Sequence, residues 1–461
     1  MGKCGIILLL LAAFAGFIGF KVKNALFEVP ELPKLEDTWW GPRDPSREDK
    51  AITPFKINVA EDVLKDLKHR LDIIKPFTPA LQGTKQDYGM HPDLLQKIIN
   101  HWKNKYDWRE REKFLNQYPQ FTVSVQGLRI HYIHIKPKNV GNKKVIPMLL
   151  LHGWPGSVRE FYEAIPHLSK PQEDFVFELI IPSLPGYGFS EAAVKPGLGA
   201  AQMAQLFKNF MDRLGFQKYY IQGGDWGAII VQHMAQLFPE KLIGVHSNMC
   251  FVNTPLSNMI TWFGAFFPSL VVTSDDEASK VYPLACKYSY ILQETGYMHL
   301  QASKPDTIGF ALKDNPAGLA AYIIEKFSTW TNKDYRDRLD GGLQEKFTYE
   351  QLLDNIMIYH VTGSITTSVR LYAESFNKAQ MSMGLSNVPV TVPSGCARQT
   401  HELNVPLEKT LRLQYHNLVH LKDYEAGHFA FLEIPKVMSE DVIEFVKTVE
   451  KMPKENIKSE L

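Results

Sequence analysis

Hydrophobic and polar residues alternate along residues 121–132, where apolar side chains take every second position on either side of a Gln-Gly pair. This period of two, broken by a two-residue turn, predicts a β-hairpin. Continuous apolar runs follow at 145–151, 175–181 and 219–221. Segments with helical spacing separate these runs, which is typical of a mostly parallel sheet buried on both faces. Further strands are expected at 241–246, 388–392 and 418–422.

Apolar residues recur at helical spacing before the hairpin, over 64–74 and 95–102, and again over 203–214. Asp107 followed by Glu110 predicts the start of a third helix in the N-terminal part. The region from 252 to 385 breaks the alternation of strands and helices and is helical and rich in aromatic residues. It is interpreted as a cap inserted over the sheet.

The stretch Gly-Gly-Asp-Trp-Gly at 223–227 lies between the predicted strand at 219–221 and a helix that ends near Phe238. A strand, a sharp turn with small residues two positions before and after a polar residue, and a helix form the nucleophile elbow of the α/β-hydrolase fold. Small residues are needed because the two backbones nearly touch there. The predicted fold is therefore an α/β-hydrolase with a helical cap, and ligands bind at the C-terminal ends of its strands.

Asp225 stands where this motif usually carries Ser. Ser needs a neighbouring base to become a nucleophile, and it suits attack on a carbonyl. An aspartic acid side chain has an ordinary pKa of about 3.9, so it is already an anion at neutral pH. A carboxylate can attack a saturated carbon that bears a strained or good leaving group, and water must then cleave the resulting alkyl ester. Asp225 therefore indicates epoxides or haloalkanes rather than peptides or ordinary esters.

The order expected for this fold is nucleophile, acid, histidine. His428 follows Gly in the loop after the last predicted strand, so it is predicted to activate the water that cleaves the ester. The candidates for the acid that orients His428 are Glu402, Asp423 and Glu425. Glu402 lies in the loop expected after the strand at 388–392, whereas the other two belong to the loop of His428 itself.

The oxyanion that forms during ester hydrolysis needs hydrogen-bond donors. In this fold they are the backbone N–H groups of the residue after the nucleophile and of a residue in an earlier turn at a strand end. Trp226 and Trp154 occupy these positions, the latter within His-Gly-Trp-Pro at 152–155. Opening an epoxide also needs a donor for the departing alkoxide, and a Tyr hydroxyl, with an ordinary pKa of about 10, suits this role.

The N-terminus carries an apolar run with no charge from Cys4 to Phe20. This run is close to the lower length limit of about 17 residues for a membrane-spanning helix. A cleaved secretory signal is the alternative, because the Ala-Phe-Ala at 13–15 resembles a cleavage site, but cleavage there would expose apolar residues at the new terminus. An uncleaved anchor is favoured, and lysines at both ends leave its orientation open.

Composition argues against several kinds of partner, site and location. The net charge is +1 without a basic stripe, which argues against a nucleic-acid partner. The scattered cysteines form no Cys-X-X-Cys pair, which argues against a disulfide framework or a zinc site, and no metal or cofactor is expected. No Asn-X-Ser/Thr sequon occurs, which weighs against a lumenal catalytic domain. The cysteines are Cys4, Cys250, Cys286 and Cys396.

These patterns divide the chain into five parts: a membrane anchor (1–23), an N-terminal segment that wraps the body (24–120), the first part of the hydrolase core (121–251), the helical cap (252–385) and the second part of the core (386–461).

Several stretches together resemble the microsomal epoxide hydrolases, and within them the insect juvenile hormone epoxide hydrolases, over nearly the whole chain. These stretches are 152–157, 223–227, 296–301, 304–307, 325–331, 362–372 and 427–429. The resemblance implies that Asp225 is the nucleophile, His428 the base and Glu402 its charge partner. It also implies that Tyr297 and Tyr372 of the cap donate hydrogen bonds to the epoxide oxygen.

The resemblance further implies a catalytic domain on the cytosolic face of the endoplasmic reticulum and a hormone or another apolar epoxide as substrate. The aromatic cap, with Trp262, Phe263, Phe266 and Phe267, suits apolar substrates of either kind. Broad clearance of xenobiotic epoxides and haloalkane dehalogenation are the alternative activities. A catalytically dead hydrolase used for binding is a further alternative, and it would have a broken triad.

Overall fold

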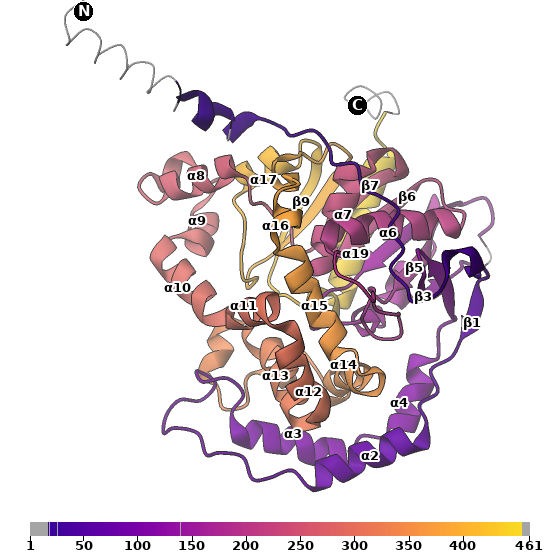
Figure 1. Cartoon of the computed structure of the whole chain (residues 1–461). Coiled ribbons are helices and arrows are strands. Elements are labelled where there is room, and N and C mark those ends of the chain that lie inside the picture. The colour runs from indigo at the N-terminus through magenta and orange to yellow at the C-terminus, as the bar shows by residue number, and fades with distance from the viewer. Residues whose placement is uncertain (1–16, 18, 25, 139, 454–461) are drawn as a thin grey trace, which may run out of the picture.

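A computed structural model describes residues 17, 19–24, 26–138 and 140–453, and one mixed sheet runs through it (Figure 1). The nine strands lie in the order β1-β2-β3-β5-β4-β6-β7-β8-β9. Their bounds are β1 Thr53–Phe55, β2 Gln120–Val125, β3 Leu128–Ile135, β4 Lys144–Leu151, β5 Phe175–Pro182, β6 Tyr219–Gly223, β7 Leu242–Ser247, β8 Ser394–Gln399 and β9 Leu418–Tyr424.

The pairing changes from antiparallel to parallel once, at β5. Strands β1, β2, β3 and β5 pair antiparallel in that order, and β2 and β3 form the predicted hairpin, with Phe121 opposite Tyr132. From β5 to β9 all neighbours run parallel. The apolar runs at 145–151, 175–181 and 219–221 lie in β4, β5 and β6. The predicted mostly parallel sheet is thus confirmed, and the C-terminal ends of its parallel strands meet at one edge.

The strand predicted at 388–392 is wrong, because the sheet strand is β8 at Ser394–Gln399. Proline has no N–H to donate to a neighbouring strand, so it is excluded from the interior of a sheet. Pro389 and Pro393 therefore interrupt the apolar run, and β8 begins directly after the second of them. As a result, Glu402 lies soon after the end of its strand.

Helices pack against the sheet, and three more lie in the N-terminal segment that precedes β2. Helix α7 contacts β4, β6 and β7, and α19 contacts β7, β8 and β9. Asp107 caps α4 as expected, since its side chain accepts the backbone N–H groups of Arg109 and Glu110. The helices outside the cap are α2 Glu61–Asp72, α3 Pro92–Asn104, α4 Trp108–Leu115, α5 Ile165–Leu168, α6 Ala200–Arg213, α7 Trp226–Leu237, α17 Glu408–Gln414, α18 Ala430–Glu433 and α19 Pro435–Glu450.

Between β7 and β8 the chain forms a separate group of helices beside the sheet (Figure 1). Helices α13 and α14 of this group contact α3, and α13 also contacts α2, so the N-terminal segment supports the cap. The group consists of α8 Pro255–Gly264, α9 Asp275–Val281, α10 Leu284–Glu294, α11 Gly296–Ser303, α12 Pro305–Asp314, α13 Pro316–Thr329, α14 Tyr349–Thr362, α15 Ile365–Ser375 and α16 Lys378–Met381.

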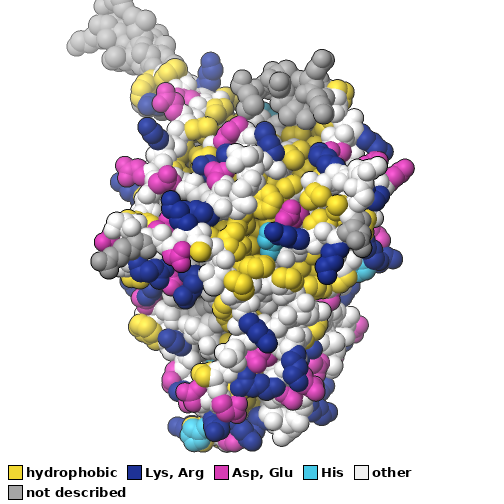
Figure 2. Space-filling model, turned by 90° about the vertical axis from the view of Figure 1, so that its right-hand side faces the viewer, with side chains coloured by type: hydrophobic (Ala, Val, Ile, Leu, Met, Phe, Trp, Pro, Cys, Tyr) yellow, Lys and Arg dark blue, Asp and Glu magenta, His cyan; other side chains and the backbone are white. Residues whose placement is uncertain are grey.

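The anchor predicted at 1–23 falls largely outside the described residues, which begin at Phe17. In the part of the chain that the structure describes, no helix is both long enough and apolar enough to cross a bilayer. On the face drawn in Figure 2, Lys, Arg, Asp and Glu side chains are interspersed around a central group of hydrophobic ones. This mixed charge agrees with the net charge of +1.

The cysteine spacing argued against a disulfide framework, but the structure pairs Cys250 with Cys396. The two residues are 146 positions apart in the sequence, and their Cα atoms are 6.0 Å apart. They come together because β7 and β8 are adjacent parallel strands, with Cys396 in β8 and Cys250 just after β7. The spacing of the two cysteines in the sequence does not indicate such a pairing.

Candidate active site

Asp225 lies at the turn between β6 and α7, with φ 51° and ψ −128°. A positive φ is strained for a residue that has a Cβ, and such strain is typical of functional sites. The turn is also crowded, since a Cβ on Gly223 would lie 2.4 Å from the backbone of Gly227. The small residues of the motif are therefore required by the close approach of strand and helix, as the sequence predicted.

Asp225 is contacted from two sides. The backbone N–H of Trp154 donates to its Oδ1 atom at 2.7 Å. The Nε2 atom of His428 lies 3.4 Å from its Oδ2 atom. The backbone N–H of Trp226 belongs to the first turn of α7, where the helix itself supplies no acceptor. Of the two predicted oxyanion donors, the Trp154 N–H thus contacts the Asp225 carboxylate, and the Trp226 N–H follows Asp225 directly in the chain.

Glu402 is the carboxylate that reaches His428. Its two oxygens lie 2.9 and 3.0 Å from His428 Nδ1, and both side chains are almost completely buried. The other two candidates have different partners. Asp423 binds the guanidinium of Arg398 at 2.6 and 3.0 Å, and Glu425 contacts His401. The structure therefore brings Glu402, and neither alternative, onto the far ring nitrogen of His428.

The surroundings of His428 alter its proton affinity. Burial lowers the pKa of His428, but the charge of Glu402 and the hydrogen bonds to Asp225 and Glu402 raise it, and the net pKa lies well above its ordinary value. An imidazolium between two carboxylates is the expected form of this arrangement. The resting site accordingly holds a proton on His428 that is available to either neighbour.

Glu433 is a residue that the sequence interpretation missed. Its oxygens accept the backbone N–H groups of Gly427 at 2.8 Å and Phe429 at 3.0 Å, on either side of His428. The backbone N–H of His428 donates to the carbonyl of Trp330 at 2.9 Å. The loop is thus fixed from α18 and from the cap. A Glu five residues after a loop histidine gives no recognisable signal in one sequence.

Tyr297 and Tyr372 come from different cap helices, α11 and α15, and their ring centroids are 5.8 Å apart. The Tyr297 ring stacks on Trp154 at 5.2 Å, and the Tyr372 ring meets Trp226 edge-on at 4.8 Å. Burial is the main cause that raises the pKa of each tyrosine well above its ordinary value, and the charge of Asp225 adds to it. Both hydroxyls therefore keep their protons and can donate hydrogen bonds.

One cavity of about 500 Å³ contains Asp225, His428, Glu402 and both tyrosines in its wall. Such a volume is typical of sites for small molecules. Most of its remaining wall is apolar. The apolar side chains are Ala200, Trp226, Ile229, Met249, Cys250, Phe251, Met298, Phe376, Met381, Leu385 and Leu403.

The aromatic residues of the cap that were expected to suit apolar substrates are not part of this wall. Trp262, Phe263, Phe266 and Phe267 are 57%, 47%, 79% and 53% exposed. They belong to α8 and the residues just after it, which face outward. Aromatic content alone could not distinguish a cavity wall from an outer surface.

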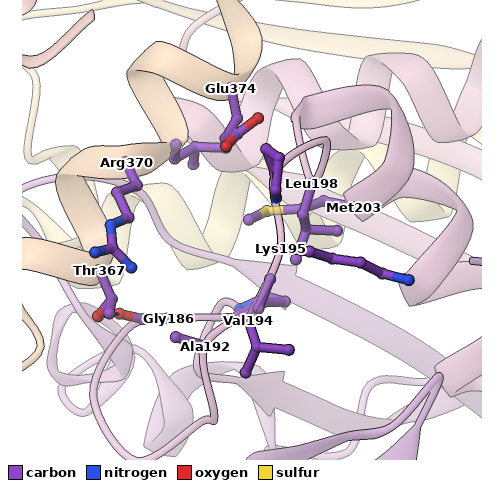
Figure 3. A pocket seen from close by; sticks show the side chains of 13 residues that line it. Gly186, Ala192, Val194, Lys195, Leu198, Met203, Thr367, Arg370 and Glu374 are labelled. Carbon is purple, nitrogen blue, oxygen red and sulfur yellow. Dashed lines mark hydrogen bonds between the residues drawn. The ribbon is translucent and has the colours of Figure 1, made fainter. Parts of the chain in front are cut away.

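A second, smaller cavity of about 290 Å³ lies on the other side of α15 (Figure 3). Two of its charged groups already have partners. Arg370 binds Asp306 of α12 at 2.6 and 2.9 Å, and Glu374 accepts the backbone N–H of Gly197 at 2.8 Å. The first contact ties α15 to α12, and the second ties it to the loop before α6. These two contacts help to hold α15, which also carries Tyr372.

Two family models match the chain: "Epoxide hydrolase N terminus" over residues 52–161 and "alpha/beta hydrolase fold" over residues 146–397. Juvenile hormone epoxide hydrolase 1 of Ctenocephalides felis is 50% identical over 97% of this chain and 96% of its own. Epoxide hydrolase 1 of Oryctolagus cuniculus is 41% identical over 96% and 99%, respectively.

Among solved structures, the juvenile hormone epoxide hydrolase of the silkworm Bombyx mori superposes with a TM-score of 0.89 at 48% identity. The match covers 90% of this chain and 99% of the silkworm chain. The similarity therefore spans the N-terminal segment, the sheet and the cap together. With this fold, this site and relatives of such identity, the chain belongs to the epoxide hydrolase family.

Proposed function

We propose that this protein hydrolyses apolar epoxides to diols in two steps. In the first step, the Asp225 carboxylate attacks an epoxide carbon, a C–O bond of the ring breaks, and an alkyl ester forms on the enzyme. Tyr297 and Tyr372 donate hydrogen bonds to the oxygen that leaves the carbon, and one of them supplies its proton. The proton that His428 carries at rest then returns to this tyrosine, so His428 is neutral before the second step. Each such donor contributes about 3–4 kcal/mol to the transition state.

In the second step, water attacks the carbonyl carbon of the ester and gives a proton to Nε2 of His428. The N–H groups of Trp154 and Trp226 bind the oxyanion, and the diol leaves with a proton as the Asp225 carboxylate reforms. Glu402 holds His428 in orientation and balances its positive charge. No cofactor or metal takes part in these steps.

One observation carries this proposal. A carboxylate stands at the nucleophile elbow, with His428 on one side and two protonated tyrosines in the wall of the same cavity. A carboxylate nucleophile needs a leaving group on saturated carbon, and paired neutral donors suit an alkoxide. A haloalkane dehalogenase needs no such pair of hydroxyls, so the tyrosines favour an epoxide.

The covalent ester is the direct test. His428→Gln should still form the ester but not cleave it, so brief exposure to an apolar epoxide should leave an adduct on the peptide that contains Asp225. Mass spectrometry with peptide mapping would detect this adduct, and Asp225→Asn is the matched control that should carry none. If the folded His428→Gln protein gains no adduct and the wild type does not hydrolyse epoxides, the proposal fails. Haloalkanes are then the next substrates to try.

We propose a juvenile hormone as the physiological substrate. The relatives with the higher identity are insect juvenile hormone epoxide hydrolases, and the apolar wall of the cavity suits a long terpenoid. Comparing kcat/KM for a juvenile hormone and for styrene oxide tests this choice. A clear preference for styrene oxide would favour general clearance of xenobiotic epoxides instead.

We also propose that the protein lies on the membrane of the endoplasmic reticulum, with residues 1–23 as an anchor and the body on the cytosolic side. The exposed aromatic residues after β7 support this arrangement. Residues 251–273 contain no charged side chain, and α8 lies at the same upper end of the molecule as the first described residues (Figure 1). Phe376 and Met381 are both exposed and in the cavity wall, so they mark its mouth.

Vesicle binding by the full chain tests the membrane contact. Replacing Trp262, Phe266 and Phe267 by Ser should lower the fraction of protein bound at limiting lipid, because aromatic side chains are favoured at the membrane interface. Phe310→Ser is the control, since Phe310 is 66% exposed on α12, away from α8. Equal binding of both variants would contradict a membrane contact at α8.

A further inference from the structure

Glu160 is a carboxylate that the proposed reaction does not use, although it lies next to the reacting groups. It belongs to the short helix η2, Val158–Phe161, which follows the turn that carries Trp154. Burial raises the pKa of Glu160 to about 8, the charge of His428 lowers it, and the charge of Asp225 raises it. The Asp225 and Glu160 carboxyls pack against glycines of the same turn, since a Cβ on Gly153 would lie 2.1 Å from Asp225 Oδ1 and a Cβ on Gly156 would lie 1.4 Å from Glu160 Oε1.

The partners of Glu160 differ from those of neighbouring charged residues. Arg159 binds Asp354 at 2.8 Å and Glu163 at 2.7 and 2.9 Å, and thus leaves Glu160 without a cation. Among the described residues, no side chain forms a hydrogen bond with the Glu160 carboxyl. The side chain lies deep in the protein but keeps some water-accessible surface. The backbone N–H of Ser157 donates to the Glu160 carboxyl. A carboxylate has about four acceptor positions, so this one N–H leaves room for an ordered water molecule.

The position of this carboxyl is fixed by close packing on Gly156. A Cβ on Gly156 would lie 1.4 Å from Glu160 Oε1, so the carboxyl occupies the place of a side chain there. The turn itself is held by α14, because Tyr359 donates to the carbonyl of Gly156 at 2.8 Å and Asn355 donates to that of Pro155 at 2.7 Å. The Glu160 carboxyl is therefore held against Gly156, which lies two residues beyond Trp154, the proposed oxyanion donor.

Glu160 also approaches the site from a different direction than the substrate. It is not in the wall of the large cavity, where the epoxide and both tyrosines would meet. It packs instead on Gly156, in the turn whose Trp154 N–H donates to Asp225. Water that attacks the ester must reach the carbonyl carbon of Asp225 without displacing the alkyl group. A water held by a carboxyl outside the substrate cavity satisfies this requirement.

We propose that Glu160 positions the hydrolytic water, which its carboxyl and His428 Nε2 hold between them. The inference rests on the two-step reaction proposed above. The water oxygen forms a bond to Cγ of the Asp225 ester, its proton passes to His428, and the C–O bond to Asp225 breaks as the diol leaves. Glu160 binds the water throughout and gains or loses no atom.

The two half-reactions separate this role from a merely structural one. In Glu160→Ala, the rate of ester formation should stay close to that of the wild type, while ester hydrolysis slows about 100-fold, the loss expected when a reacting group is misplaced. Quenched-flow mass spectrometry of the Asp225 peptide measures both rates in a single turnover, and the ester should accumulate. Glu160→Gln keeps a donor and an acceptor and should restore most of the hydrolysis rate.

Gly156→Ala tests the same role without removing Glu160. Its added methyl group would push the Glu160 carboxyl away from its place on the turn. Its effect should match that of Glu160→Ala, and the double variant should hydrolyse the ester no more slowly than either single one. Glu433→Gln is the structural comparison, since Glu433 is a buried carboxyl whose oxygens are filled by backbone N–H groups. It should slow both half-reactions together.

The outcomes are distinct. If the wild type forms no ester at all, the two-step function itself fails. If the wild type forms the ester and the Glu160 and Gly156 variants slow both steps equally, or leave hydrolysis unchanged, the assignment of the water to Glu160 is overturned. A variant that does not fold is replaced by Glu160→Asp, which should slow hydrolysis to a rate between those of the wild type and the other variants.

Discussion

The charge of Asp225 controls the protonation of His428 in the resting site. Two of the causes that raise the pKa of His428 are the hydrogen bond to Asp225 and its negative charge. Both disappear when Asp225 becomes a neutral ester, whereas burial, which lowers the pKa, remains. The proposed first step therefore converts His428 from an imidazolium into a base at the moment when a base is needed.

Asp225→Asn mimics the neutral ester and should lower the pKa of His428 relative to the wild type. NMR titration of a ¹⁵N-labelled imidazole in the folded protein measures this change. The sign of the linked stability follows from a folded pKa above the unfolded value of about 6.5. Stability from this coupling is fully present below pH 6.5 or so and is lost as pH rises through the folded pKa. An unchanged or raised pKa in Asp225→Asn would contradict the coupling.

Tyr297→Phe and Tyr372→Phe each remove one proposed donor without changing the shape of the ring. Each should lower the rate of ester formation about 10²- to 10³-fold and leave ester hydrolysis much less affected. Tyr322→Phe is the matched control, because its ring packs on Trp154 at 5.8 Å while its hydroxyl accepts a hydrogen bond from Gln301. Single-turnover rates would show whether Tyr322→Phe also slows the first step, which would speak against a specific donor pair.

At the scale of elements, the elbow depends on how closely β6 and α7 approach each other. The strained backbone at Asp225 holds its carboxylate in the cavity wall, and Trp226 begins α7 directly after it. The same geometry places the Trp226 amide and the Trp226 ring, against which Tyr372 packs. A small separation of β6 and α7 would therefore move the Asp225 carboxylate, the Trp226 N–H and the Trp226 ring together.

Gly223→Ala should separate them, because the added Cβ would lie 2.4 Å from the backbone of Gly227. Overpacking of this kind costs about 1–3 kcal/mol, and the displaced carboxylate should also reduce ester formation. Thermal unfolding and single-turnover kinetics check the two effects. Gly296→Ala is the control for stability, since no atom lies within 4 Å of its added Cβ. Similar unfolding midpoints for the two variants would contradict the crowding.

At the scale of the whole molecule, Asp354 joins three parts of the fold. It lies in α14 of the cap, is fully buried, and accepts hydrogen bonds from Arg111 and Tyr106 of the N-terminal segment. It also binds Arg159, next to Glu160, at 2.8 Å. The cap, the N-terminal helices and the turn behind the site are thus connected through a single carboxylate.

Asp354→Ala leaves Arg159 buried without this partner, and breaking a buried ion pair costs about 3–5 kcal/mol. Urea unfolding should therefore show a large fall in the transition midpoint. Glu444→Ala removes one half of an exposed pair with Lys422, which should change stability by less than about 1 kcal/mol. Comparable losses in the two variants would show that the connection through Asp354 does not stabilise the assembled molecule.

The sequence by itself determined the parts of this protein that depend on local chemistry. The period of two, the apolar runs and the elbow at 223–227 predicted the sheet and the hydrolase fold, because strand patterning and tight turns are encoded by neighbouring residues. The elbow also identified Asp225, and chain order identified His428. Pro389 and Pro393 exclude the strand that was predicted at 388–392, so the sheet strand begins instead at Ser394.

Only the tertiary structure decided which distant residues meet. Sequence reasoning favoured Glu402 over Asp423 and Glu425 by its place in a separate loop and by the family resemblance. The contact itself depends on which carboxylate reaches His428 across two loops. The pairing of Cys250 with Cys396 and the position of Glu160 beside the site depend on adjacent strands and on one packed turn. Contacts between residues far apart in the chain arise when the whole core packs, so no local pattern in the sequence records them.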